Sequence, residues 1–250
     1  MSEENKRKSS EIKVPSVLDL AKAGVHLGHK TTRRSPQMDP YICGVKNSIH
    51  IIDLEKTSEK LQAALDFIVE SVSRGANILF VGTKPAAKDI VEKYAQELKI
   101  PYVTEHWLGG VLTNFSTISK LIEKYNRMQK EKEGGEWEKY TKKERHELSK
   151  DIERLKVMVG GISALVKKPD IIYIVDILKE KTAVREAKIS KIPVVAMIDT
   201  NVNPNLVEWP IPANDDATKS IELITGLIAA AVEKGRKEIE NKNKKEKISE

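Results

Sequence analysis

Aspartates near the ends of predicted strands are the first candidates for chemistry in this chain. They are Asp176, Asp199, Asp215 and Asp216. Carboxylates gathered at strand ends can hold a cation or act as general acid and base. Aspartate is also a common helix cap, and Asp215 and Asp216 stand just before a predicted helix, so we expect a capping role for them.

Histidine spacing offers a second kind of chemistry. His26 and His29 occur in Gly-Val-His-Leu-Gly-His, a spacing found in metal sites, and Cys43 and His50 lie within range as further ligands. Structural zinc sites usually draw on paired Cys-x-x-Cys spacings, which are absent from this sequence. We therefore expect no metal and no other cofactor, and these four residues remain the alternative.

A phosphate could in principle bind where Gly82-Thr83-Lys84 follows a predicted strand and opens a helix. The glycine spacings of nucleotide-binding P-loops and of dinucleotide folds occur nowhere in the sequence. A small α/β enzyme that binds a nucleotide is thus the minor alternative to a protein without catalytic activity.

Positive charge is concentrated between residues 28 and 46. This stretch contains one acid, Asp39, beside four cations: Lys30, Arg33, Arg34 and Lys46. Arginine suits bidentate contact with phosphate, and the net charge of +6 favours a polyanionic partner. We read the stretch as a loop that binds RNA; an ordinary solvated surface loop is the alternative.

Composition narrows the class of protein. The single cysteine excludes an intramolecular disulfide and fits the cytoplasm. Residues 1–13 lack the apolar region of a signal peptide and are expected to form a flexible arm. Leu223–Val232 is too short to cross a bilayer, and residues 236–250 form a charged tail that we expect to be flexible. No membrane association is indicated.

Short β-rich runs alternate with helical patterns, which predicts a Rossmann-like, doubly wound parallel sheet over residues 14–117 and 167–235. The predicted strands are Ile49–Asp53, Asn77–Val81, Tyr102–Thr104, Ile171–Asp176 and Val194–Asp199. The predicted helices are Thr57–Ser73, Pro85–Leu98, Lys179–Ser190 and Asp216–Lys234.

Residues 118–166 interrupt this alternation between the third and fourth predicted strands. Apolar residues recur there at spacings of three and four: Ile118, Leu121 or Ile122, Tyr125 and Met128, then Leu148, Ile152, Leu155, Val159, Ile162 and Val166. With a turn at Gly134-Gly135, the pattern predicts an antiparallel α-helical coiled-coil hairpin. Trp107 should anchor its base in the core, where Gly109-Gly110 and Gly160-Gly161 let backbones approach.

Six motifs in one order carry a resemblance to a known family. They are residues 23–29 (AGVHLGH), 47–57 (NSIHIIDLEKT), 78–84 (ILFVGTK), 107–114 (WLGGVLTN), 169–170 (PD) and 211–216 (IPANDD). Over residues 14 to 236 the chain resembles the bacterial ribosomal protein two family of the small subunit.

The resemblance implies a flavodoxin-like or Rossmann-like domain with a protruding coiled-coil hairpin, no catalytic activity, and a place in the small ribosomal subunit of the cytoplasm. It implies contact with small-subunit rRNA and with neighbouring ribosomal proteins, including recruitment of small-subunit protein one. The RNA-binding candidates are His26, His29, Lys30, Arg33, Arg34, Lys46, Lys84, His106 and Asn114.

The chain also departs from the family pattern. Arg34-Ser35-Pro36 stands where Trp-Asn-Pro is usual, and His106 replaces an arginine before Trp107. Ala213 replaces a glycine before Asn-Asp-Asp. If that position needs a positive φ angle, alanine would strain the turn.

Overall fold

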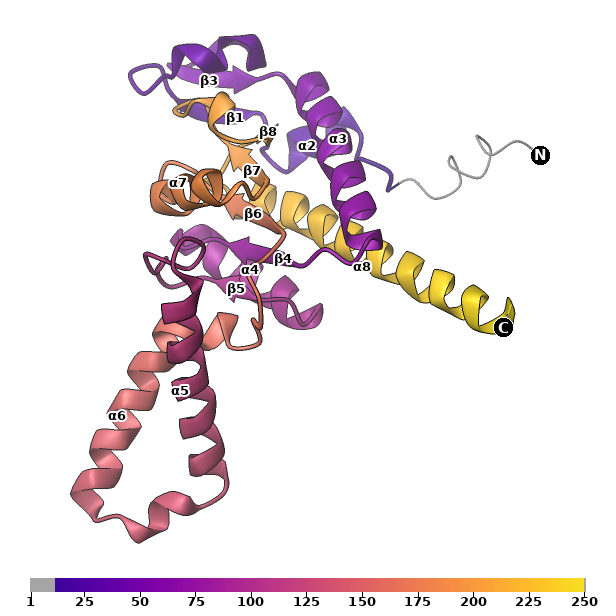
Figure 1. Cartoon of the computed structure of the whole chain (residues 1–250). Helices are drawn as coiled ribbons and strands as arrows, with labels where there is room; N and C mark the ends of the chain where they lie inside the picture. Colours follow the sequence, from indigo (N-terminus) through magenta and orange to yellow (C-terminus); the bar gives the residue numbers. More distant parts are fainter. Residues whose placement is uncertain (1–11, 250) are drawn as a thin grey trace.

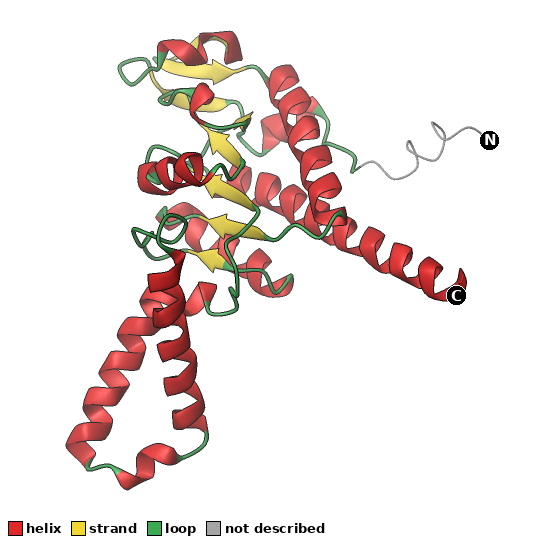
Figure 2. Ribbon diagram, viewed as in Figure 1, coloured by secondary structure: helices red, strands yellow, loops and turns green. Residues whose placement is uncertain are grey.

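A five-stranded parallel sheet with strand order β5-β4-β6-β7-β8 forms the centre of the molecule (Figures 1 and 2). The computed structural model describes residues 12–249. The strands are β4 (Ile78–Val81), β5 (Tyr102–Val103), β6 (Ile171–Val175), β7 (Val194–Ile198) and β8 (Trp209–Pro212). All residues of β4, β6 and β7 are buried, as expected where helices cover both faces.

Helices pack on both faces of this sheet. On one face Phe80 and Tyr173 join a core formed with α3 (Leu54–Ser73), α4 (Pro85–Glu97) and α8 (Thr218–Ser249). On the other face Leu79 and Ile172 join a core formed with α7 (Lys181–Ser190) and with residues of the insertion between β5 and β6. The predicted doubly wound α/β arrangement is therefore present.

The predicted strand Ile49–Asp53 is present, but its assignment to the parallel sheet is wrong. β3 (Ile49–Ile52) is the central strand of a separate three-stranded antiparallel sheet, with β1 (Leu27–Lys30) and β2 (Ile42–Lys46) beside it. Asn47 and Ser48, at φ 51° and 60°, make the tight turn from β2 to β3. Such a two-residue turn joins antiparallel neighbours, so β3 pairs with β2 rather than with the parallel sheet.

β8 was missed because Pro210 and Pro212 argue against a strand. It lies at the edge of the sheet, paired only with β7, where a residue without an N–H is tolerated. Because β3 is not part of the parallel sheet, the insertion stands between the second and third strands of that sheet, β5 and β6, rather than between the third and fourth.

The insertion forms two helices, α5 (Phe115–Glu133) and α6 (Lys142–Val159), joined by the short 3-10 helix η2 (Glu136–Lys139). We call this pair the arm. The predicted seam is buried at Ile118, Ile122, Tyr125, Met128, Ile152, Leu155 and Val159. Val166 was assigned to the seam wrongly, because it is 93% exposed beyond the helix end. In Figure 1 the helices diverge toward η2, and coiled-coil supercoiling stays a prediction.

Trp107 is 4% exposed and lies in the core at the arm base, as predicted. Gly161 packs directly against the Tyr102 carbonyl, where a Cβ would not fit. Gly109, in contrast, faces open space, so the predicted close approach of two backbones does not occur there. Gly110 is required for a different reason, its φ of +99°.

The two ends of the chain complete the described structure. The N-terminal segment that was predicted to be flexible, residues 1–13, falls almost wholly outside the described residues. These begin with residue 12 and lead into α2 (Val17–Lys22). α8 continues through residues 236–249, so that part of the tail is helical, and its flexibility stays a prediction. No helix within residues 12–249 is long and apolar enough to span a membrane.

Candidate functional site

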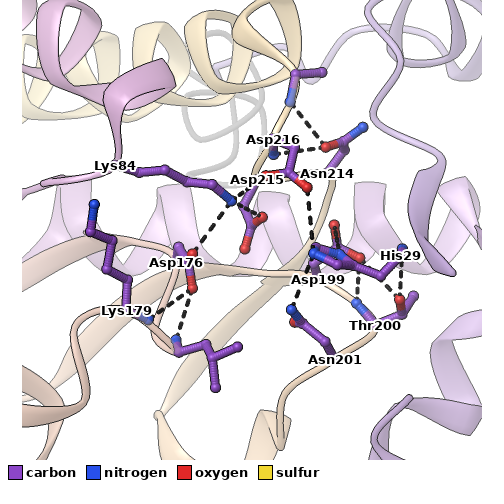
Figure 3. A network of polar contacts seen from close by, with 12 residues as sticks. His29, Lys84, Asp176, Lys179, Asp199, Thr200, Asn201, Asn214, Asp215 and Asp216 are labelled. Atoms are coloured by element: carbon purple, nitrogen blue, oxygen red, sulfur yellow. Dashed lines mark hydrogen bonds and ion pairs between the residues drawn. The ribbon is translucent and has the colours of Figure 1, made fainter. Parts of the chain in front are cut away.

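Polar side chains meet beyond the carboxyl ends of the parallel strands (Figure 3). We call the following residues the strand-end cluster: His29, Lys84, Asp176, Asp199, Asp215 and Asp216. Lys84 follows β4, Asp176 follows β6, Asp199 follows β7, and the last two follow β8. Parallel strands end at one edge, so residues distant in sequence are brought together there.

Lys84 lies at the centre of this cluster. Its ammonium is 2.6 Å from Asp215 Oδ1, 2.6 Å from Asp216 Oδ1 and 3.4 Å from Asp176 Oδ2. The side chain is 16% exposed. Burial lowers the pKa of Lys84, but the carboxylates, Asp215 foremost, raise the pKa further, so the ammonium stays charged. The predicted phosphate ligand is thus already paired with carboxylates.

Asp176 has a φ of +66°, an unusual value for a residue other than glycine. Its Oδ1 accepts hydrogen bonds from the amides of Leu178 (2.9 Å) and Lys179 (3.1 Å), while its Oδ2 faces Lys84. Backbone conformations of this kind persist where the surroundings fix them, often at functional sites.

The expected helix caps, Asp215 and Asp216, are turned toward Lys84 instead. Asn214 takes the local role before α8, because its Oδ1 accepts hydrogen bonds from the amides of Asp216 and Ala217. Ala213 is buried and is not among the described residues with positive φ, so the alanine does not strain this turn.

His29 points into the cluster rather than toward solvent. Its Nδ1 is 2.9 Å from Asp199 Oδ2 and its Nε2 is 3.4 Å from Asp216 Oδ2. The contact with Asp199 raises the pKa of His29. Gly28 makes this placement possible, because a Cβ there would lie 2.6 Å from the Thr200 Cγ2 atom.

Carboxylate capacity is left over within the cluster. Asp215 Oδ2 is buried without a hydrogen-bond partner, whereas Asp199 Oδ2 has the His29 ring beside it. Burial, with the charges of Asp176 and Asp199, raises the pKa of Asp215 to about 7. His29, Asp199, Asp215 and Asp216 each offer one ligand atom, all within 4.8 Å of one another. One imidazole nitrogen with carboxylate oxygens is a set that a divalent transition metal accepts.

The predicted alternative set of metal ligands is not brought together. Among the described residues, His29 is the only member found in a group of three or more potential ligands. Cys43 is exposed on β2. Both ring nitrogens of His50 and the Nδ1 of His26 are buried without a hydrogen-bond partner, and the backbone carbonyl of His26 accepts from Ile52.

The three-stranded sheet presents the other predicted residues. Lys30, Arg33 and Lys46 are exposed and take part in no ion pair within residues 12–249. We call these three the free cations. Arg34 is exposed but is paired with Asp39 through a bidentate contact. Segment 31–35 adjoins the strand-end cluster, since Ser35 donates its amide to the carbonyl of Thr200.

His106 and Asn114 lie apart from that sheet, at the base of the arm, and both are exposed. The Oδ1 of Asn114 accepts the hydroxyls of Ser116 and Thr117, each at 3.1 Å. Sequence reasoning missed Thr200 and Asn201, which contact His29 through its amide and its ring. Their only signal was their place directly after a strand ending in aspartate.

Comparison with known proteins gives one consistent result. The model of the family described as ribosomal protein S2 matches residues 20–235. The small ribosomal subunit protein uS2 of Coprothermobacter proteolyticus is 45% identical over 223 residues, which cover 89% of this chain and 83% of that relative.

Two further relatives bear the same name. The protein of Fusobacterium nucleatum is 45% identical, covering 91% of this chain and 93% of its own, and that of Chloroherpeton thalassium is 48% identical, covering 86% of both. These names confirm the expected ribosomal location and a family of structural proteins rather than enzymes. The chain therefore belongs to the ribosomal protein S2 family of the small ribosomal subunit.

Proposed function

We propose that this chain binds small-subunit rRNA and that the free cations, Lys30, Arg33 and Lys46, make the principal phosphate contacts. The observation that carries the proposal is their exposure without a carboxylate partner in the described part of the chain. Binding to phosphate releases counterions only where a cation is available, so an uncompensated side chain contributes more than a paired one.

The free cations also lie in a suitable setting. Lys30 ends β1, Lys46 ends β2, and Arg33 stands in the loop between those two strands. The hydrogen bonds of the sheet therefore fix the backbone beside two of the three charges. Phosphate contacts made from a fixed scaffold position a protein on RNA without reading the base sequence.

Assembly into subunits tests this proposal. A tagged wild-type copy should sediment with small subunits in a sucrose gradient, and a Lys30→Ala/Arg33→Ala/Lys46→Ala variant should be released at lower salt. The matched control changes three exposed lysines elsewhere, Lys22, Lys93 and Lys237, to alanine. Equal release of the two variants would show that total charge, and not this sheet, holds the protein.

The free edge of β2 is the proposed contact for small-subunit protein one. Residues 43–46 are exposed, with Val45 at 56%, and β2 is an edge strand of the three-stranded sheet. Exposed apolar side chains on an edge strand favour contact with another protein chain. This placement supports the recruitment that family resemblance implies.

Purified protein one should bind this chain, and Val45→Glu should weaken the complex in size-exclusion chromatography. Val157→Glu on the arm is the control, because Val157 is exposed to nearly the same extent, at 57%. An intact complex with Val45→Glu would place protein one elsewhere.

We also propose that residues 118–166 form a coiled-coil hairpin inserted between the two parts of the α/β domain, residues 14–117 and 167–235. This hairpin, the arm, would have a partner surface of its own. Its buried seam lies between α5 and α6, and the remaining positions are mostly charged. A seam that is satisfied internally leaves the charged positions to contact rRNA or neighbouring proteins.

A second role, cation binding at the strand-end cluster, is favoured by the buried and unpartnered Oδ2 atom of Asp215 and by the four potential ligand atoms that lie within 4.8 Å of one another. Chelator-treated protein titrated with Zn²⁺ should bind one equivalent in calorimetry and gain thermal stability. Asp215→Asn should abolish both effects, whereas Asp66→Asn, at an exposed site on α3, should retain them. Equal behaviour of the two variants would refute the site.

A further inference from the structure

One buried carboxylate joins α7 to the segment that leads into the arm. We call residues 107–114 the arm-base segment; it ends immediately before the first residue of α5, Phe115. Glu186 of α7 is 6% exposed and faces this segment. In Figure 1 the loop above α5 lies beside α7.

Both oxygens of Glu186 accept hydrogen bonds from the arm-base segment. Oε1 accepts from the Trp107 ring nitrogen at 3.2 Å and from the Gly110 amide at 2.8 Å. Oε2 accepts from the Leu112 amide at 3.1 Å, the Thr113 amide at 3.2 Å and the Thr113 hydroxyl at 3.1 Å. Main-chain amides that converge on one anion form a favourable binding concavity.

The next turn of α7 adds a further contact, since the Ser190 hydroxyl donates to the Leu112 carbonyl at 3.2 Å. Residues four apart lie on the same face of a helix, so Glu186 and Ser190 both contact the arm-base segment from one face of α7. Burial raises the pKa of Glu186, but its donors, the Gly110 amide first among them, lower the pKa more, and the group is held as a carboxylate.

The α6 side of the arm is supported differently. The turn η3 (Gly160–Ile162), which follows α6, packs against β5, with Gly161 against the Tyr102 carbonyl. That support is steric, whereas the α5 side combines the buried side chains of Trp107, Val111 and Leu112 with hydrogen bonds to one charged group. A change at Glu186 should therefore loosen the α5 side of the arm while the α6 side remains docked.

We propose that Glu186 is the positioning residue that sets the direction of the arm relative to the parallel sheet. Each of its donors lies in the arm-base segment, and that segment has no residue between it and α5. Fixing the segment fixes the starting direction of α5 and, through the seam, the position of α6. This inference concerns the isolated chain and does not depend on RNA binding.

Glu186→Gln tests the proposal with almost no change in shape. The amide keeps one acceptor oxygen but turns an NH₂ group toward N–H donors that need an acceptor, so hydrogen bonds are lost while packing is kept. Glu180→Gln is the matched control: Glu180 is also buried beside α7, but it accepts the Thr83 hydroxyl in the body of the protein.

The measurement is a spin-label distance distribution between the arm tip and the body. The sole cysteine, Cys43, is exposed and serves as one labelling site, and Glu138→Cys, at an exposed position in η2, provides the other. Amide hydrogen exchange at Gly110, Leu112 and Thr113 is recorded on the same variants.

The proposal expects Glu186→Gln to broaden and shift the distance distribution and to accelerate exchange at the three amides, while Glu180→Gln leaves both unchanged. Thr113→Val, which removes only the hydroxyl contact, should give a smaller change in the same direction and covers the case that Glu186→Gln does not fold. An unchanged distribution in Glu186→Gln, or equal broadening in Glu180→Gln, would overturn it.

Discussion

The strand-end cluster and the three-stranded sheet handle positive charge in opposite ways. In the cluster, the ammonium of Lys84 is largely shielded from solvent and lies among three carboxylates that compensate its charge. On the small sheet and the loop between β1 and β2, Lys30, Arg33 and Lys46 are exposed and form no ion pair among the described residues, although the charge of Arg33 contributes to lowering the pKa of Asp216. The two regions adjoin, yet the cation of the first is held by carboxylates inside the fold and the cations of the second are available to a polyanion. A cation's surroundings, rather than its presence, therefore decide its role.

Lys84→Met should break the first half of this comparison most strongly. Removing one partner from a buried ion pair leaves carboxylates uncompensated and costs about 3–5 kcal/mol in the free energy of unfolding. Urea titration measures this loss. Lys88→Met on α4, the helix that Lys84 precedes, removes a half-exposed pair with Glu105 and should cost about 1 kcal/mol or less. Similar losses in the two variants would mean that Lys84 is not held as described.

Removal of the free cations should have the opposite effect, weakening RNA binding while leaving the free energy of unfolding nearly unchanged. The Lys30→Ala/Arg33→Ala/Lys46→Ala variant should reduce the slope of log affinity for small-subunit rRNA against log salt by about 2–3, because each phosphate contact contributes about one unit. Its unfolding free energy should stay within about 0.5 kcal/mol of wild type per substitution, as for surface positions generally. An unchanged salt slope would remove these residues from the interface.

The arm base supplies a pH test that separates stability from binding. The pKa of Glu186 is lowered from its usual 4.5 in the folded protein, so its contribution is complete above that value and is lost as the pH falls through the folded pKa. Urea midpoints measured from about pH 6 down to about pH 3 should fall less steeply in Glu186→Gln than in wild type. Parallel curves would contradict a charged Glu186 in the fold.

Arg34 gives the smallest and finest test, since it stands next to Arg33 but is paired with Asp39. Arg34→Ala should change the unfolding free energy by at most about 1 kcal/mol, as exposed ion pairs do. It should also lower rRNA affinity less than Arg33→Ala does, which competition binding measures. A larger loss with Arg34→Ala would show that the Asp39 pair opens on RNA.

Much of the fold was readable from sequence because its signals are local. The periodicity of α5 and α6, the strand–helix alternation, and the apolar surroundings of Trp107 all predicted elements that the structure contains. The three-stranded sheet was not readable, since its strands are short and β2 is exposed along nearly its whole length, leaving no alternation to detect.

The candidate site was less predictable for a related reason. Aspartates at strand ends were recognised, but their pairing with Lys84 and His29 depends on strand order, which sequence spacing does not encode. His29 and Lys84, both candidates for RNA contact, have side chains that point into the cluster, and their contact with RNA stays a prediction. Glu186 carried no signal at all, because its donors are mostly main-chain amides from a segment more than seventy residues away.

Directed cleavage from Cys43 tests the central claim most directly. An iron chelate attached to this exposed cysteine on β2, in assembled small subunits, would generate hydroxyl radicals beside the free cations. The account predicts cleavage of small-subunit rRNA from Cys43, and weaker cleavage from a label at Glu97→Cys, exposed at the end of α4, in a Cys43→Ser background. Absence of rRNA cleavage from Cys43 in subunits that retain the protein would contradict it.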